Sequence, residues 1–144
     1  MRRVNLGCGL DILPGWDNID LVSASPKVKS VDLDGWWPWQ AGEVDEFRAI
    51  DVFEHVADPV HFMVEAHRCL RPGGRLHIQT CWWQHWTAYA DPTHKRYLDL
   101  TSFDFWIPGT EFYQQNPMYG GVAFERVHVK LTGTQQIEAV LLRA

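Results

Sequence analysis

Three places in the sequence carry carboxylate or imidazole side chains that could take part in chemistry. Asp20 lies near the end of the apolar segment 16–22, and the string Asp51-Val-Phe-Glu-His55 ends the segment 47–52. A third string, Asp-Pro-Thr-His-Lys-Arg at residues 91–96, lies in a later section rich in aromatic residues. A carboxylate can accept hydrogen bonds from both hydroxyls of a ribose, and an imidazole can accept a proton or bind a metal ion. These residue types therefore predict a site for a polar small ligand with a proton acceptor close by.

Two glycines close the first apolar segment, in the string Val4-Asn-Leu-Gly-Cys-Gly9. Glycine lets the backbone turn sharply and approach a ligand without an intervening Cβ. A dinucleotide-binding turn would continue to a third glycine that serves the pyrophosphate, but Ile12 occupies that place. The turn therefore fits a nucleoside ligand without a pyrophosphate better than a nicotinamide dinucleotide.

Composition limits the classes of protein that need to be considered. The chain has 144 residues, of which 46% are hydrophobic and 22% charged, so one globular domain with a proper core is expected. A net charge of -5 disfavours a protein that binds nucleic acid by neutralising phosphates. The three cysteines are odd in number and lack metal-type spacing, which indicates reduced thiols and a cytoplasmic protein. No apolar run is long enough for a membrane span, and the first five residues leave no room for a signal peptide.

The order of apolar segments and turn residues predicts an α/β fold. Strands are expected at residues 4–8, 16–22, 28–33, 47–52 and 75–81, and a helix from Asp58-Pro59 to about Leu70. Two late alternating segments around the turn 132–135 predict a C-terminal antiparallel hairpin. The expected fold is a Rossmann-like doubly wound sheet, mostly parallel, with about seven strands. We expect a single domain over 1–144, made of a cofactor-binding half (1–81), a substrate or lid segment (82–121) and the terminal hairpin (122–144).

The helices of this fold must be reduced. A parallel crossover needs at least ~10–12 residues including its helix, yet only residues 10–15 separate the first two predicted strands. The same holds between the second and third strands. Eight tryptophans are unusual for this length, and we expect some of them to cover sheet surface that helices would otherwise bury.

The motifs in this order resemble those of class I S-adenosylmethionine-dependent methyltransferases of type 11. The most specific match is Glu65-Ala-His-Arg-Cys-Leu-Arg-Pro-Gly-Gly-Arg-Leu76, which sets the fifth strand in register. Glu65 and Arg68 stand at i,i+3, so an ion pair on the helix surface is expected there. The cofactor-binding residues that the resemblance implies are Gly7, Cys8, Gly9, Asp20, Leu21, Asp32, Leu33 and Asp51.

Within that set, Asp20 would bind the ribose, and Asp32 with Leu33 the adenine. Asp34 could bind the adenine in place of Asp32, because it lies one step further along the same face of the extended chain. Trp36 or Trp37 is an alternative wall for the adenine ring.

The string Asp51–His55 resembles the turn that faces the transferring methyl group. In some quinone and RNA methyltransferases the matching turn binds a divalent metal, so Asp51, Glu54 and His55 are metal-ligand candidates. Without a metal, His55 would orient the substrate or act as a base. His94 is a candidate general base or fourth ligand, and Arg96 a candidate for binding an acidic substrate group. The alternative is that residues 91–96 form a structural turn.

The acceptor is the least determined part of the prediction. The Asn/Asp-Pro-Pro-aromatic string of amino-methylating DNA enzymes is absent, so a small-molecule or glycan oxygen is the expected acceptor. Two other classes stay open: a non-catalytic subunit that needs a partner over its pocket, and a nucleotide-dependent oxidoreductase, which Ile12 disfavours. The sequence does not determine the oligomeric state.

Overall fold

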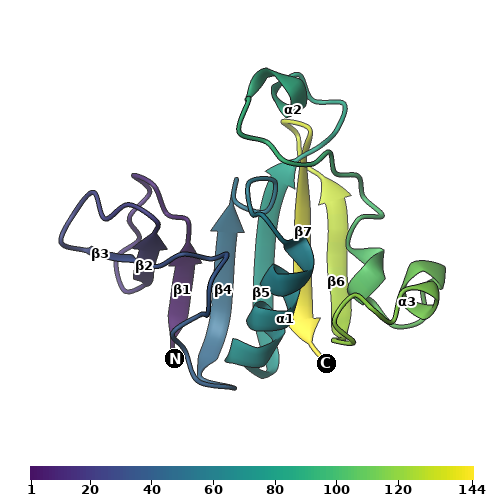
Figure 1. The fold of residues 1–144 in the computed structure, drawn as a ribbon, viewed down its shortest axis with the longest axis horizontal. Helices are drawn as coiled ribbons and strands as arrows, with labels where there is room; N and C mark the ends of the chain where they lie inside the picture. Colours follow the sequence, from purple (N-terminus) through teal and green to yellow (C-terminus); the bar gives the residue numbers. More distant parts are fainter.

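The computed structural model describes residues 1–144 and contains one seven-stranded sheet in the order β3-β2-β1-β4-β5-β7-β6 (Figure 1). The strands are β1 Arg3–Leu6, β2 Asp17–Asp20, β3 Val28–Ser30, β4 Val44–Ile50, β5 Leu70–Cys81, β6 Phe124–Leu131 and β7 Gln136–Arg143. The first five pair in parallel, and β7 pairs antiparallel with both β5 and β6. The predicted fold, including the terminal hairpin, is confirmed.

The chain changes direction across the sheet between β1 and β4, which are neighbours. From β1 it proceeds to β2 and β3 on one side, and from β4 to β5 on the other. Open parallel sheets bind ligands at the carboxyl ends of the strands that flank such a switch point. Gly7 follows β1 and Asp51 follows β4, so both lie there.

Helix α1, Pro59–Cys69, starts as the sequence predicts. The Asp58 side chain accepts hydrogen bonds from the amides of Val60 and His61, and Pro59 occupies the first helical position. The helix ends at Cys69, close to the expected end at about Leu70, but β5 begins at Leu70 rather than at Arg75. Residues 71–74 make an irregular excursion opposite Asp45, where the pairing register shifts and Arg71 Nε lies 2.7 Å from Asp45 Oδ1.

Only one long helix covers the sheet. Residues 7–16 and 21–27 connect β1, β2 and β3 without a helix, as their length predicts. Figure 1 shows α1 across one face, the short α2 (Thr87–Ala90) beyond the sheet's upper edge, and α3 (Glu111–Gln115) beside β6. The remaining element, η1 (Asp104–Trp106), is a single 3₁₀ turn.

The face under α1 carries the core, and the opposite face is polar. Strand alternation directs Phe47 and Ala49 of β4 into the core, where both are fully buried. The opposite face pairs its charges across strands, as with Arg75 and Glu46 at 3.8 Å and His77 and Glu138 at 3.2 Å. No helix is long and apolar enough to span a membrane.

Tryptophans replace part of the missing helical cover, as expected. Trp37 and Trp39 are buried and pack edge-on against Phe47, with ring centroids 5.2 and 5.3 Å away. Glu65 Oε2 accepts a hydrogen bond from the Trp37 amide at 2.9 Å, and Arg68 donates to the carbonyl oxygens of Trp37 and Trp39. The expected Glu65–Arg68 ion pair is present, but Glu65 is only 3% exposed. The pair is therefore not on the helix surface. It attaches the loop 31–43, called the tryptophan loop below, to α1.

Candidate functional site

The first cavity lies at the carboxyl edge of β1, β2 and β4 and has a volume of about 240 Å³. Its lining combines aliphatic side chains with four aspartates and contains no lysine or arginine. The lining residues are Gly7, Asp20, Leu21, Val31, Asp32, Leu33, Asp34, Asp51, Val52, His55 and Val56. Six of the eight residues predicted to bind the cofactor are among them.

The turn after β1 requires glycine at residue 7, because Val52 packs directly against its backbone. Gly7 has φ +58°, and a Cβ at this position would lie 2.5 Å from Val52 Cγ2. The Gly9 amide donates to Asp20 Oδ2 at 2.8 Å, and the Leu21 amide donates to Asp20 Oδ1 at 2.7 Å. The Asp20 carboxylate is thus fixed between the glycine turn and the end of β2, beside the cavity.

Asp32 and Asp34 both line the cavity and play different structural parts. Asp32 Oδ1 accepts from the Asp34 amide at 2.9 Å, whereas Asp34 Oδ1 accepts from the Ala57 amide at 2.8 Å. Neither Trp36 nor Trp37 lines the cavity. Trp37 is buried in the core, and Trp36 stacks on Arg68, with 4.1 Å between the ring centroid and the guanidinium. The alternative prediction that one of these tryptophans forms a wall for the adenine is therefore wrong.

Cys8 and Gly9 do not line the first cavity. Gly9 reaches the site through its bond to Asp20, and Cys8 faces a neighbouring cavity. Burial raises the pKa of the Cys8 thiol, which disfavours a reactive thiolate.

A second cavity, of about 520 Å³, adjoins the first at Asp51 and His55, which line both. It is lined further by residues from the ends of β5 and β7 and from the segment around α2. These residues are Glu54, Gln79, Cys81, His85, Trp86, Thr87, Ala90, Asp91, His94 and Gln136. Six of these residues were not predicted from the sequence: Gln79, Cys81, His85, Thr87, Ala90 and Gln136. Three of the six, Gln79, Cys81 and Gln136, stand at or near strand ends beside the predicted site.

Asp51 occupies the junction between the cavities in a strained conformation. Its φ is +57°, a value that residues other than glycine adopt rarely, and its amide donates to the Gln79 carbonyl oxygen at 2.9 Å. Backbone strain of this kind gathers at functional sites.

Glu54, His55 and His94 form a compact cluster in the second cavity, with one ligand-type atom from each within 4.8 Å of the others. The two imidazole rings lie 4.7 Å apart, edge to face. Glu54 is buried and accepts a hydrogen bond from the Thr80 hydroxyl at 2.7 Å. The structure thus brings together two histidines that are far apart in the sequence, as the prediction for His94 requires.

The hydrogen bonds around the histidines orient both rings. His94 Nδ1 lies 3.2 Å from the Ala88 carbonyl oxygen, which can only accept, so Nδ1 carries the proton and Nε2 the lone pair of the neutral ring. The Thr93 hydroxyl donates to Asp91 at 2.7 Å and lies 3.0 Å from His55 Nδ1, which gives His55 the same tautomer. The hydrogen bond from the Thr93 side chain lowers the pKa of Asp91 and keeps it ionised.

Arg96 lines neither cavity, which corrects the prediction that it binds a substrate group. Its guanidinium donates to the carbonyl oxygens of Phe53 and Val56, at 2.7 and 2.5 Å, and also contacts that of Ala57. Burial lowers its pKa. Arg96 therefore holds the turn between β4 and α1 in place and positions His55 indirectly.

Comparison with known families identifies the class of protein. The profile of a family described as "Methyltransferase domain" matches residues 6–78, from β1 to the end of the parallel part of the sheet. The chain belongs to this methyltransferase family, whose cofactor is S-adenosylmethionine. The acidic first cavity, which Asp20 and three further aspartates line, suits a ligand that carries a sulfonium cation.

Solved structures share the fold at low sequence identity. An S-adenosylmethionine-dependent methyltransferase from Mesorhizobium loti is 15% identical with TM-score 0.66, over 99% of this chain and 90% of that one. One from Aquifex aeolicus is 12% identical with TM-score 0.66, over 100% and 82%. A methyltransferase in complex with the Haloferax volcanii Trm112 activator is 14% identical with TM-score 0.64, over 99% and 82%.

One sequence relative is closer over a short stretch. A Streptomyces fradiae protein named "Uncharacterized 37.1 kDa protein in transposon TN4556" is 51% identical over 39 residues. The stretch covers 27% of this chain and spans only 11% of that relative.

Proposed function

We propose that this chain transfers a methyl group from S-adenosylmethionine to an oxygen atom of a small-molecule or glycan acceptor. The observation that carries the proposal is the shared border of the two cavities. Asp51 and His55 line both, so a ligand in each would meet at these residues. Methyl transfer is an in-line displacement, and an enzyme accelerates it mainly by aligning the two partners.

In this proposal the first cavity holds the cofactor, which supplies an electrophilic methyl group. Asp20 accepts hydrogen bonds from the ribose hydroxyls, and Asp32 binds the adenine amino group beside Leu33. Asp51 places its negative charge near the sulfonium. All four line that cavity.

The second cavity holds the acceptor. The lone pair on His94 Nε2, which lies 3.6 Å from Asp91 Oδ2, accepts the proton that a hydroxyl loses, and His55 orients the acceptor. The cavity has three carboxylates and no lysine or arginine, which disfavours an acidic acceptor. Trp86, 75% exposed at the rim, suits stacking against a sugar or another flat hydroxylated surface. Residues 82–121 act as the substrate segment.

The substitution His94→Ala tests the base. Loss of a positioned general base costs about 10²- to 10⁴-fold, so turnover should fall on that scale while S-adenosylhomocysteine binds with unchanged affinity. Release of S-adenosylhomocysteine would be measured across a panel of hydroxylated small molecules and oligosaccharides. His128→Ala, on the far face of the sheet and outside both cavities, is the matched control. Normal turnover in His94→Ala would show that His94 is not the base and that residues 91–96 form only a structural turn.

A divalent metal is a second use of the same cluster. The expected ligands were Asp51, Glu54 and His55, whereas the structure groups Glu54 and His55 with His94 in place of Asp51. One carboxylate and two neutral imidazoles suit zinc better than magnesium. Calorimetric titration of wild type and Glu54→Gln with zinc and magnesium salts would decide, together with activity in EDTA. Full activity in EDTA together with no heat of zinc binding would contradict the metal site and support His94 as the base.

A partner-dependent or non-catalytic role is the alternative function. It is supported by the Haloferax volcanii complex, in which a protein of this fold is held by an activator. Purified chain that binds S-adenosylhomocysteine but turns over only after a second protein is added would favour it. We place the protein in the cytosol, because its three cysteines are free and buried.

A further inference from the structure

A third cavity, of about 280 Å³, adjoins the cofactor cavity at Gly7 and Asp51, which line both. It lies beside the loop that replaces the missing first helix. Its other lining residues are Asn5, Cys8, Leu10, Asp11, Arg48 and Ile50. No role assigned above uses this cavity.

Arg48 is the only lysine or arginine among the residues that line the three cavities meeting at Asp51. The cofactor cavity carries four aspartates, and the acceptor cavity three carboxylates. An anionic group on either ligand would therefore be repelled from both, and Arg48 offers the one favourable position for it.

Two protein partners position the Arg48 guanidinium and leave it able to bind a ligand as well. It is on β4 and points to the face opposite α1, where one nitrogen donates to Oδ1 of the buried Asn5 at 3.0 Å. A second nitrogen lies 3.0 Å from Asp11 Oδ2, and this carboxylate is 61% exposed. The Arg48 side chain is 23% exposed, so the pair is open to solvent mainly on its Asp11 side, where a ligand carboxylate can compete for the guanidinium.

S-adenosylmethionine ends in an amino acid with one ammonium and one carboxylate. We propose that Arg48 binds this α-carboxylate, and that the carboxylates of Asp11 and Asp51 accept hydrogen bonds from the α-ammonium. One guanidinium and two carboxylates line this cavity, which matches the charges of the zwitterion, and a guanidinium can bind a carboxylate through two parallel hydrogen bonds. The proposal rests on the family's cofactor and not on the identity of the acceptor.

The test compares three ligands by calorimetry: S-adenosylhomocysteine, its decarboxylated analogue 5′-(3-aminopropylthio)adenosine, and methylthioadenosine, which lacks the whole amino acid. Wild-type protein should bind S-adenosylhomocysteine about 10- to 100-fold more tightly than the decarboxylated analogue, as expected for one charge-assisted contact. Arg48→Met should abolish this difference by weakening S-adenosylhomocysteine alone. Methylthioadenosine should bind wild type and variant alike.

Two further variants separate binding from folding and from net charge. Arg48→Lys keeps the cation and should retain part of the preference, which keeps the test valid if Arg48→Met does not fold. Arg75→Met removes an arginine from the same face of the sheet, outside the three cavities, and should change nothing.

The proposal is overturned if wild type binds the carboxylated and decarboxylated ligands equally well. It is also overturned if Arg48→Met weakens all three ligands alike, or if Arg75→Met reproduces its effect. Failure of wild type to bind any of the three would instead contradict the cofactor itself, so the two failures are distinguishable.

Discussion

Asp51 shows most clearly how a single residue joins structure to function in this protein. It is one of two residues other than glycine with positive φ, the other being Gln135 in the turn between β6 and β7. The two have the same φ of +57°, but only Asp51 lines the cavities. The strain at Gln135 belongs to a hairpin turn, whereas that at Asp51 presents a carboxylate to both proposed ligands.

This pair allows strain and charge to be separated. Glycine adopts positive φ freely, so Asp51→Gly and Gln135→Gly should each change the free energy of unfolding by about 1 kcal/mol or less, in the stabilising direction. Asp51→Gly alone should weaken S-adenosylhomocysteine. Urea unfolding and calorimetry would measure the two effects. Equal ligand affinity in both variants would show that the Asp51 carboxylate does not contact the cofactor.

At the scale of elements, the loop 31–43 is held to α1 by polar contacts around one glutamate. The hydrogen bond from Arg68 lowers the pKa of Glu65, and the bond from the Trp37 amide adds to this effect. The loop carries Asp32, Leu33 and Asp34, so the attachment of the tryptophans to α1 also positions one wall of the proposed cofactor cavity.

Glu65→Gln should therefore destabilise the fold by about 1.5–3 kcal/mol at neutral pH, as for a charge-assisted hydrogen bond. A glutamate pKa that is lower in the folded state adds stability above its unfolded value of about 4.3, and that stability is lost as the pH falls through the folded pKa. Wild type should thus lose stability in this range more steeply than Glu65→Gln. Urea unfolding from pH 7 to pH 3 would measure this, with the exposed Glu111→Gln of α3 as control. Parallel pH profiles for wild type and Glu65→Gln would contradict the buried ion pair.

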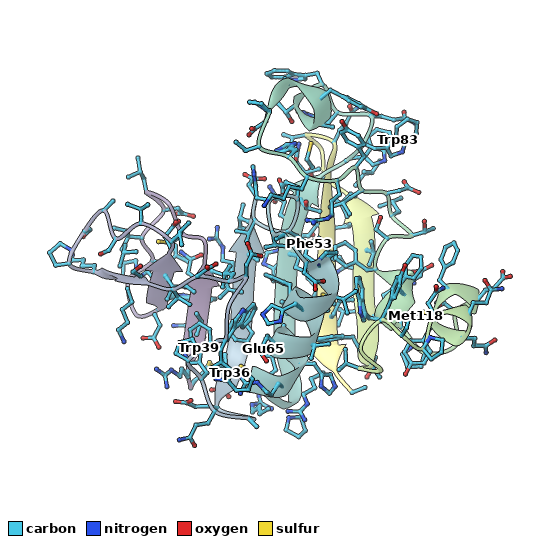
Figure 2. The ribbon with its side chains drawn as sticks, viewed as in Figure 1. Trp36, Trp39, Phe53, Glu65, Trp83 and Met118 are labelled. Carbon is cyan, nitrogen blue, oxygen red and sulfur yellow. The ribbon has the colours of Figure 1, made fainter.

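In the whole molecule, the two faces of the sheet are covered by different structures. Parallel strands are usually buried on both faces, yet here α1 and the tryptophan loop cover one face and paired polar side chains cover the other. Figure 2 shows Trp39, Phe53 and Glu65 gathered around α1, and Trp83 at the upper end near α2. The edge that carries the proposed ligand sites is therefore built from loops at the end of the sheet.

Amide hydrogen exchange should distinguish the centre of the sheet from the loops at its edge. Amides of β4, β5 and β7, which form the centre of the sheet, should exchange slowest, and those of residues 10–15 and of α2 fastest. Addition of S-adenosylhomocysteine should slow exchange at residues 7–9, 20–22 and 31–34, while the hairpin turn 132–135 stays unchanged as an internal control. Uniform protection across the chain, or none, would contradict the location of the cofactor cavity.

The sequence alone determined the parts of this protein that depend on local chemistry. Asp58 and Pro59 mark the start of α1 because capping and a fixed φ are properties of those residues wherever they occur. The alternating tail predicts the hairpin, and the short connections after β1 and β2 exclude helices there. The motif order was enough to predict the fold and the position of Gly7, Asp20 and Asp51 along one edge of the sheet.

Only the tertiary structure decided how side chains from distant segments combine. Arg96 is committed to backbone carbonyl oxygens because the turn after β4 packs against it, and His94 meets His55 because the segment around α2 folds back over the sheet's edge. The same holds for the burial of Glu65 and for the isolation of Arg48 among carboxylates. Residue type sets what a side chain can bind. Which partner it meets depends on packing between segments that sequence spacing does not encode.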